Sequence, residues 1–187
     1  MELTIADRCE KLVRALEAKG VAVRANLRPG SNREEIVKKA AVLGLKLPAE
    51  VIELYQWRNG HFDDDGPTLC FRDNNFISLE RALTAHADIV GSYGAASEDV
   101  DLEACFPIAE FDGAWYVVAC GQHSFGSDKP YPVISVSEGV DLFYYSLGAM
   151  LDTCIAWVSR PEWEQYDHVP NDIEMKIWKQ YNPGIFS

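Results

Sequence analysis

The spacing of the apolar residues changes twice along this chain, and that change constrains the fold more than any other feature. Residues 3–19 place apolar side chains at helical intervals, at Ile5, Cys9, Leu12 and Leu16. Residues 106–145 form short apolar runs separated by hairpin signals, at Asp112-Gly113 and Glu138-Gly139. Helical spacing returns over residues 147–158. The order predicts an α+β fold, in which an antiparallel sheet of hairpins packs against N-terminal and C-terminal helices.

Cap and turn residues divide the helical regions into separate elements. Ser31 begins a capping box and is expected to open a helix that ends at Gly44. Pro48 suits the first turn of the next helix, which Asn59-Gly60 is expected to end. Ser78 is expected to cap a helix that runs to about Val90. The remaining expectations are strands over 21–25 and 68–71, a turn over 73–75, a loop over 91–104 and a helix over 171–181.

The charge of the chain is strongly uneven. The formal net charge is −12, yet residues 1–50 carry 10 basic and 7 acidic groups, whereas residues 51–187 carry 7 basic and 22 acidic groups. Direct binding to nucleic acid or to an anionic membrane needs a basic surface, so neither is expected. Two interpretations remain open: an acidic surface that only keeps the protein in solution, and one that steers a basic partner.

Neither a membrane span nor a secretion signal is expected. No stretch approaches the about 18 consecutive apolar residues of a membrane span. The first residues are charged and lack the apolar segment of a signal peptide. The five cysteines are widely spaced and lie in apolar surroundings, at Cys9, Cys70, Cys105, Cys120 and Cys154. We expect a cytoplasmic protein whose thiols are reduced core residues.

The common signatures of catalytic and cofactor sites do not occur in the sequence. Phosphate-binding, dinucleotide-binding, hydrolase and zincin motifs are all missing. The nearest cysteine and histidine are Cys120 and His123, and Cys120 ends an apolar run that predicts a buried thiol. We therefore expect no catalytic residue, no metal ligand and no cofactor.

The acidic run Asp63-Asp64-Asp65-Gly66 resembles a calcium loop only superficially. A calcium-binding EF-hand loop needs a glutamate at its twelfth position, where this chain has Asn74. A solvated turn, a weak cation site and a contact with a partner remain as alternatives.

Three aromatic residues near the C-terminus lie outside the strongest apolar pattern, namely Trp163, Tyr166 and Trp178. They suit either a lid that packs on the core or an exposed contact patch. We expect the lid, because large apolar patches are uncommon on the surface of a monomer.

Residues 34–60 carry a more specific pattern. It consists of Glu34-Glu35-Ile36, Leu43-Gly44, Leu47-Pro48, Tyr55 and Asn59-Gly60. This pattern resembles the opening signature of the SUKH superfamily, which is named partly for a yeast regulator of cell-wall assembly. The later stretch is similar too, with Phe106-Pro107-Ile108-Ala109, Asp112-Gly113 and a closing helix. The resemblance covers about residues 31–159 of a single domain that spans residues 1–187, with an added N-terminal helix and a C-terminal helical extension.

The resemblance implies a protein-binding function rather than catalysis. Bacterial members of the superfamily resemble immunity proteins, which are small, non-catalytic and bind toxins, often nucleases, that competing cells deliver. An acidic inhibitor suits the basic groove of a nuclease, so a basic toxin domain is the expected partner. The candidate partner-binding residues are Asp63, Asp64, Asp65, Glu98, Asp99, Asp101 and Glu103.

Two alternatives from other functional classes stay open. A regulatory interaction module, as in the eukaryotic branch of the superfamily, would share the fold and bind a signalling or cell-wall protein. An enzyme would need a concave pocket in which histidine, cysteine and carboxylate groups converge.

Overall fold

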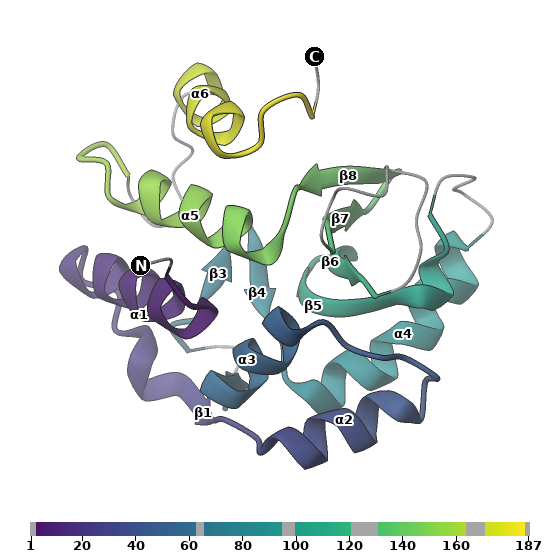
Figure 1. Cartoon of the computed structure of the whole chain (residues 1–187). Helices are drawn as coiled ribbons and strands as arrows, with labels where there is room; N and C mark the ends of the chain where they lie inside the picture. Colours follow the sequence, from purple (N-terminus) through teal and green to yellow (C-terminus); the bar gives the residue numbers. More distant parts are fainter. Residues whose placement is uncertain (1–2, 63–65, 95–99, 121–130, 164–170, 186–187) are drawn as a thin grey trace.

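The computed structural model describes residues 3–62, 66–94, 100–120, 131–163 and 171–185. Within these residues the predicted α+β fold is confirmed: helices surround an antiparallel sheet (Figure 1). The helices are α1 (Ile5–Ala18), α2 (Arg33–Ala41), α3 (Ala49–Trp57), α4 (Leu79–Tyr93), α5 (Leu147–Val158) and α6 (Asn171–Tyr181), with two short 3-10 helices, η1 (Val23–Asn26) and η2 (Leu102–Ala104).

The main sheet is an antiparallel meander, in which each strand pairs with the next one along the chain. Its strands are β3 (Cys70–Phe71), β4 (Asn74–Phe76), β5 (Cys105–Phe111), β6 (Ala114–Ala119), β7 (Val133–Val136) and β8 (Val140–Tyr144). The predicted hairpin at Asp112-Gly113 is present, with Phe111 opposite Ala114. Both turn residues have positive φ, 46° and 81°, as the tight two-residue turn of a hairpin requires.

The helices cover this sheet from several sides (Figure 1). Helix α4 packs on β5, and α5 lies between α1 and α6. A separate two-stranded sheet joins β1 (Leu27–Pro29) to β2 (Arg58–His61) and places α3 beside it. The fully buried ring of Tyr55 on α3 lies 5.4 Å from the ring of Phe76 and 5.9 Å from that of Phe106. These rings join the N-terminal helices to the sheet in one apolar core.

Several local predictions were wrong. The strand expected over residues 21–25 is absent: residues 23–25 belong to the 3-10 helix η1, and the backbone pairs in a sheet only from Leu27 onward. The cap of α2 is Asn32 instead of Ser31, since the Asn32 side chain accepts from the N–H of Glu35 at 2.9 Å. The expected turn at 73–75 starts one residue earlier, at Arg72. The expected loop at 91–104 is shorter, because α4 extends to Tyr93 and η2 begins at Leu102.

Asn59-Gly60 has a different role from the predicted helix end. Helix α3 already ends at Trp57, and both residues lie in strand β2. The Asn59 Oδ1 accepts from the N–H of Leu79 at 2.6 Å, so this side chain satisfies the first N–H of α4, whose N-cap is Ser78 as predicted. Gly60 has φ +69°, and a Cβ built there would lie 2.4 Å from the backbone nitrogen of Ser78. The glycine therefore permits both the backbone conformation and the close approach of β2 to α4.

Several ion pairs connect elements that are distant in the sequence. Arg8 on α1 binds both oxygens of Asp152 on α5, at 3.0 and 3.1 Å. Arg81 on α4 makes a similar two-pronged contact with Glu110 on β5 and lies 5.1 Å over the ring of Trp115. Such paired geometry fixes orientation as well as distance. The neighbouring residue Glu80 accepts a hydrogen bond from the ammonium group of Lys39 on α2.

We predict that Gly60→Ala destabilises the fold far more than Gly20→Ala. Both glycines have positive φ, but no atom lies within 4 Å of a Cβ built at Gly20. Gly20→Ala should lower the free energy of unfolding by about 1 kcal/mol, from backbone strain alone. Gly60→Ala should lower it by about 2–4 kcal/mol, because β2 and α4 must also separate. Equal losses in urea denaturation would contradict the close approach.

We also predict that part of the acid sensitivity comes from Glu10. Hydrogen bonds from Arg24 hold the pKa of Glu10 below its usual 4.5. Burial opposes this effect, and a hydrogen bond from the indole of Trp57 adds to it. A lowered pKa stabilises the fold above the unfolded value, and this contribution disappears as the pH falls. Glu10→Gln should therefore cost about 1 kcal/mol at pH 7 and progressively less below pH 4.5.

The control for this experiment is Glu34→Gln, which removes a similar carboxylate from an exposed position on α2. Urea denaturation at several pH values measures the difference between each variant and the wild-type chain. A cost for Glu10→Gln that stays constant between pH 7 and pH 3 would contradict the assignment.

Candidate functional site

Two of the seven predicted partner-binding residues lie in the described part of the chain. Asp101 and Glu103 flank the start of η2, and both are exposed. The other five lie outside the described residues, and they are Asp63, Asp64, Asp65, Glu98 and Asp99.

The short helix η2 holds these two carboxylates on the surface because its apolar residues are anchored. Val100 and Leu102 are only 4% and 3% exposed. The Asp101 Oδ1 accepts from the N–H of Glu103 at 3.0 Å, which makes Asp101 the cap of this turn. Alternation between buried and exposed positions thus directs both acidic side chains to solvent. Neither forms an ion pair with any residue that the structure describes.

Helix α4 fixes the position of η2. The buried ring of His86 lies with its Nε2 3.1 Å from the carbonyl oxygen of Glu103. His61, the other described histidine, is also buried, and its Nε2 accepts from the N–H of Leu69 at 2.6 Å. Both imidazoles are therefore engaged by the backbone and hold neighbouring segments together.

Three of the five cysteines are core residues as predicted, but the prediction is wrong for Cys70 and Cys120, which lie at the edge of the core. Cys9, Cys105 and Cys154 are buried, whereas Cys70 and Cys120 are half-buried. Burial raises the pKa of the Cys105, Cys120 and Cys154 thiols to about 12. Thiolate is the nucleophilic form, so burial makes these groups poor nucleophiles near neutral pH.

The described residues hold neither a candidate metal site nor a helix that could span a membrane. Within them, no three side chains of the metal-binding types come together. In the same part of the molecule, every helix is too short or too polar to cross a bilayer.

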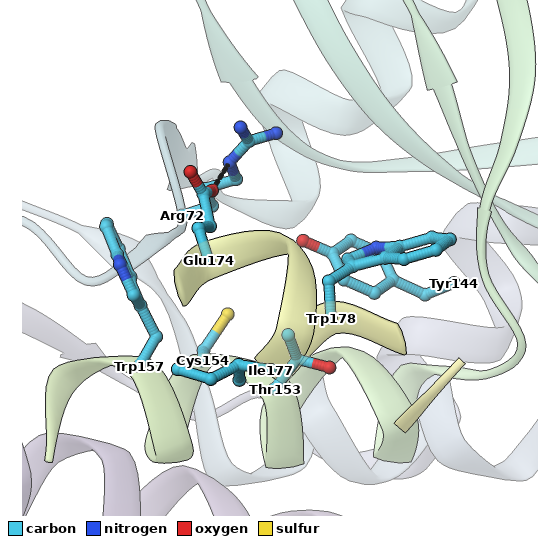
Figure 2. A pocket seen from close by; sticks show the side chains of 8 residues that line it. All are labelled: Arg72, Tyr144, Thr153, Cys154, Trp157, Glu174, Ile177 and Trp178. Carbon is cyan, nitrogen blue, oxygen red and sulfur yellow. Dashed lines mark ion pairs between the residues drawn. The ribbon is translucent and has the colours of Figure 1, made fainter. Parts of the chain in front are cut away.

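A second surface feature lies where α6 covers α5 and the sheet (Figure 2). The space has room for little more than one water molecule, with a cavity volume of about 20 Å³. Its lining comes from the β3–β4 turn, β8, α5 and α6, and consists of Arg72, Tyr144, Thr153, Cys154, Trp157, Glu174, Ile177 and Trp178.

Arg72 is the charged centre of this feature. Figure 2 shows its guanidinium directed at Glu174 of α6, with which it forms an ion pair. The guanidinium also lies 5.6 Å over the ring of Phe143. Arg72 occupies the β3–β4 turn with φ +61°, a conformation that is uncommon for a residue with a side chain. The sequence pattern did not single out Arg72, since its partner lies about a hundred residues further along the chain.

The C-terminal aromatic residues form the expected lid where the structure describes them. Trp163 and Trp178 are 6% and 5% exposed, and Tyr166 lies outside the described residues. Asn182 is fully buried, and its amide connects the backbone N–H of Tyr145, just after β8, to Thr153 of α5. The tail is therefore packed against the rest of the molecule.

We predict that the thiols react slowly in the folded protein. A pKa of about 12 leaves only about one thiol in 10⁵ ionised at pH 7. Iodoacetamide should therefore modify Cys105, Cys120 and Cys154 of the native chain at least about a thousandfold more slowly than free glutathione, and should modify all five cysteines in urea. A single cysteine that reacts at the rate of glutathione in the native chain would contradict this prediction and support a nucleophilic site.

A protein-family model matches this chain. The model of the SMI1 / KNR4 family (SUKH-1) matches residues 30–153, which is more than half of the chain. The match includes α2 to α4, the whole main sheet and the first half of α5. Helix α1 precedes it, and α6 follows it. The comparison with curated proteins finds no relative.

Proposed function

The chain belongs to the SMI1 / KNR4 family (SUKH-1), and from this premise we propose that it is a non-catalytic immunity protein. In this proposal it binds a bacterial toxin domain directly and blocks the toxin's basic surface. The family membership supports a protein-binding role. The choice of a basic toxin as partner rests on the charge of this chain.

The observation that carries the proposal is the charge asymmetry. Residues 51–187 contain 22 acidic and only 7 basic groups. A nuclease must present a basic groove to the phosphates of its substrate. An acidic protein is attracted to that groove over distances of about a Debye length, which accelerates association. Charge complementarity also disfavours neutral and acidic proteins as partners.

Asp101 and Glu103 are the described residues that best fit this role. They are exposed, and the hydrogen bond between the Asp101 side chain and the Glu103 N–H keeps the turn in one conformation. Such preorganisation lowers the entropy that is lost on binding. The acidic residues at 63–65 and 98–99 remain candidates by their sequence alone, and they lie outside the described residues.

Structural roles account for the groups that an enzyme would need most. The thiols have raised pKa values, and the described imidazoles bond to backbone groups. These contacts support a binding domain over an enzyme with a cysteine or histidine at its reactive centre.

The decisive test is protection. The product of the adjacent gene should bind the chain in a pull-down, and cells for which that product is toxic should survive when they also express the chain. Toxicity that persists despite co-expression of both proteins would contradict the immunity role for that pair. Inhibition of the purified toxin upon binding of the purified chain would show that neutralisation is direct.

We predict that the double variant Asp101→Asn/Glu103→Gln associates with this toxin about fivefold more slowly at low salt. The dependence of the association rate on salt should weaken as well, because fewer charges act across the interface. The matched control is Glu138→Gln/Asp141→Asn, which removes the same charge from exposed positions of the β7–β8 hairpin. Stopped-flow measurements that find identical rates for the two double variants would exclude η2 from the binding surface.

A further inference from the structure

The small sheet of β1 and β2 carries an arginine that pairs with no carboxylate in the described part of the chain. Other half-buried arginines each form an ion pair, namely Arg8, Arg24, Arg72 and Arg160. Arg28 on β1 is half-buried as well, yet no ion pair engages it within the described residues. The chain has 29 acidic and only 17 basic groups, so carboxylates are not scarce. Arg28 therefore keeps its capacity to bind an anionic group.

The guanidinium of Arg28 is held with one edge inward. It lies 5.9 Å over the ring of Phe62, the residue that follows β2. Its Nε is buried and has no hydrogen-bond partner, whereas its two Nη groups are not among the buried atoms of this kind. The Nη groups therefore face the surface. Their parallel N–H donors match the two oxygens of a carboxylate, which is the geometry of the strongest arginine contacts.

Phe62 supplies the apolar half of the same surface. Its side chain is 62% exposed, more than that of any other aromatic residue that the structure describes. The backbone beneath this ring is fixed, because the Phe62 N–H donates to the carbonyl oxygen of Asn26 at 2.9 Å. Aromatic and arginine side chains carry much of the binding energy in protein interfaces, and a fixed backbone lowers the entropy that is lost on binding.

A buried asparagine holds the backbone on both sides of this surface. Asn26 is only 9% exposed, and its Nδ2 also donates to the carbonyl oxygen of Pro67 at 3.2 Å. The segment that begins at Phe62 and ends at Pro67 is thus tied to one buried residue at both ends. Arg28 and Phe62 are therefore presented from a rigid base.

The same small sheet holds a second arginine that lacks a carboxylate partner. Arg58 lies opposite Pro29 in the register of β1 and β2, one residue from Arg28. Its Nη1 donates to the carbonyl oxygen of Trp57 at 2.8 Å, and it forms no ion pair with a residue that the structure describes. This sheet thus presents guanidinium groups, whereas η2 presents carboxylates.

We propose that Arg28 and Phe62 form a docking site for a segment of a protein partner. The segment carries a carboxylate that pairs with the Nη groups of Arg28, and an adjacent apolar side chain that covers the ring of Phe62. Charge complementarity selects this occupant, because a cation without a partner is best matched by an anion. The site goes beyond the proposed function, since it lies on β1 and β2 rather than on η2. A partner that is basic overall can still supply one carboxylate here.

The test is an NMR titration of the isotope-labelled full chain with a short peptide. The probe is acetyl-Gly-Leu-Glu-Phe-Lys-Gly-amide, whose net charge of zero avoids attraction or repulsion over long distances. The side-chain Nε–H signal of Arg28 and the backbone amide signal of Phe62 should shift until they saturate. The matched peptide with glutamine in place of glutamate should bind at least fivefold more weakly. Signals that do not move, or equal binding of the two peptides, would overturn the proposal.

Variants of the chain separate the two halves of the site. Arg28→Gln and Phe62→Ala should each weaken binding of the glutamate peptide at least fivefold. The matched controls are Arg33→Gln, which removes an exposed charge from α2, and Phe111→Ala, which removes a ring that is 54% exposed on the β5–β6 hairpin. Both controls should bind the peptide as the wild type does. Equal losses in the test and control variants would contradict the assignment.

Two further outcomes concern the kind of partner. A single-stranded oligonucleotide that shifts the same signals more strongly than the peptide would assign the site to phosphate groups and overturn the proposal. Peptide binding that persists while the product of the adjacent gene fails to bind the chain would overturn the proposed immunity role alone.

Discussion

The contact between Asn59-Gly60 and the start of α4 is the constraint on which most of the structure depends. Gly60 has no side chain, so the backbone of β2 approaches Ser78 more closely than any Cβ would allow. The Asn59 side chain then accepts from the first free N–H of α4. This junction sets the direction of α4, which in turn carries Arg81 to β5 and His86 to η2. The sheet and the acidic turn are thus positioned from one point.

Two features on this scaffold differ in their physical basis. In the proposed function, Asp101 and Glu103 attract a basic partner through charge over a long range, and salt weakens that attraction. The contacts of α6 act at short range instead, because the Arg72 guanidinium meets the Glu174 carboxylate and the ring of Trp178 packs beside that of Phe143. Charge accelerates the encounter of two proteins, whereas close packing decides which contacts persist.

Sequence periodicity predicted the helices and the hairpins of the main sheet. Asp112-Gly113 was sufficient to identify a hairpin, because few dipeptides satisfy two positive φ values in succession. Local patterns failed where a distant segment decides the conformation. Asn59-Gly60 indicated a helix end, yet its role is set by Ser78 and Leu79 of another element. For the same reason, no local signal identified Arg72, whose partners are on β8 and α6.

The sequence by itself determined the fold class, the resemblance to the SUKH superfamily and the acidic character of residues 51–187, since each depends on residue order and type alone. Only the tertiary structure decided that α6 covers Arg72, and that Asp101 and Glu103 share one anchored turn. It also decided that the imidazoles of His61 and His86 contact backbone groups of other segments. These features depend on contacts between segments that are far apart in the chain. Their geometry exists only after the core has packed.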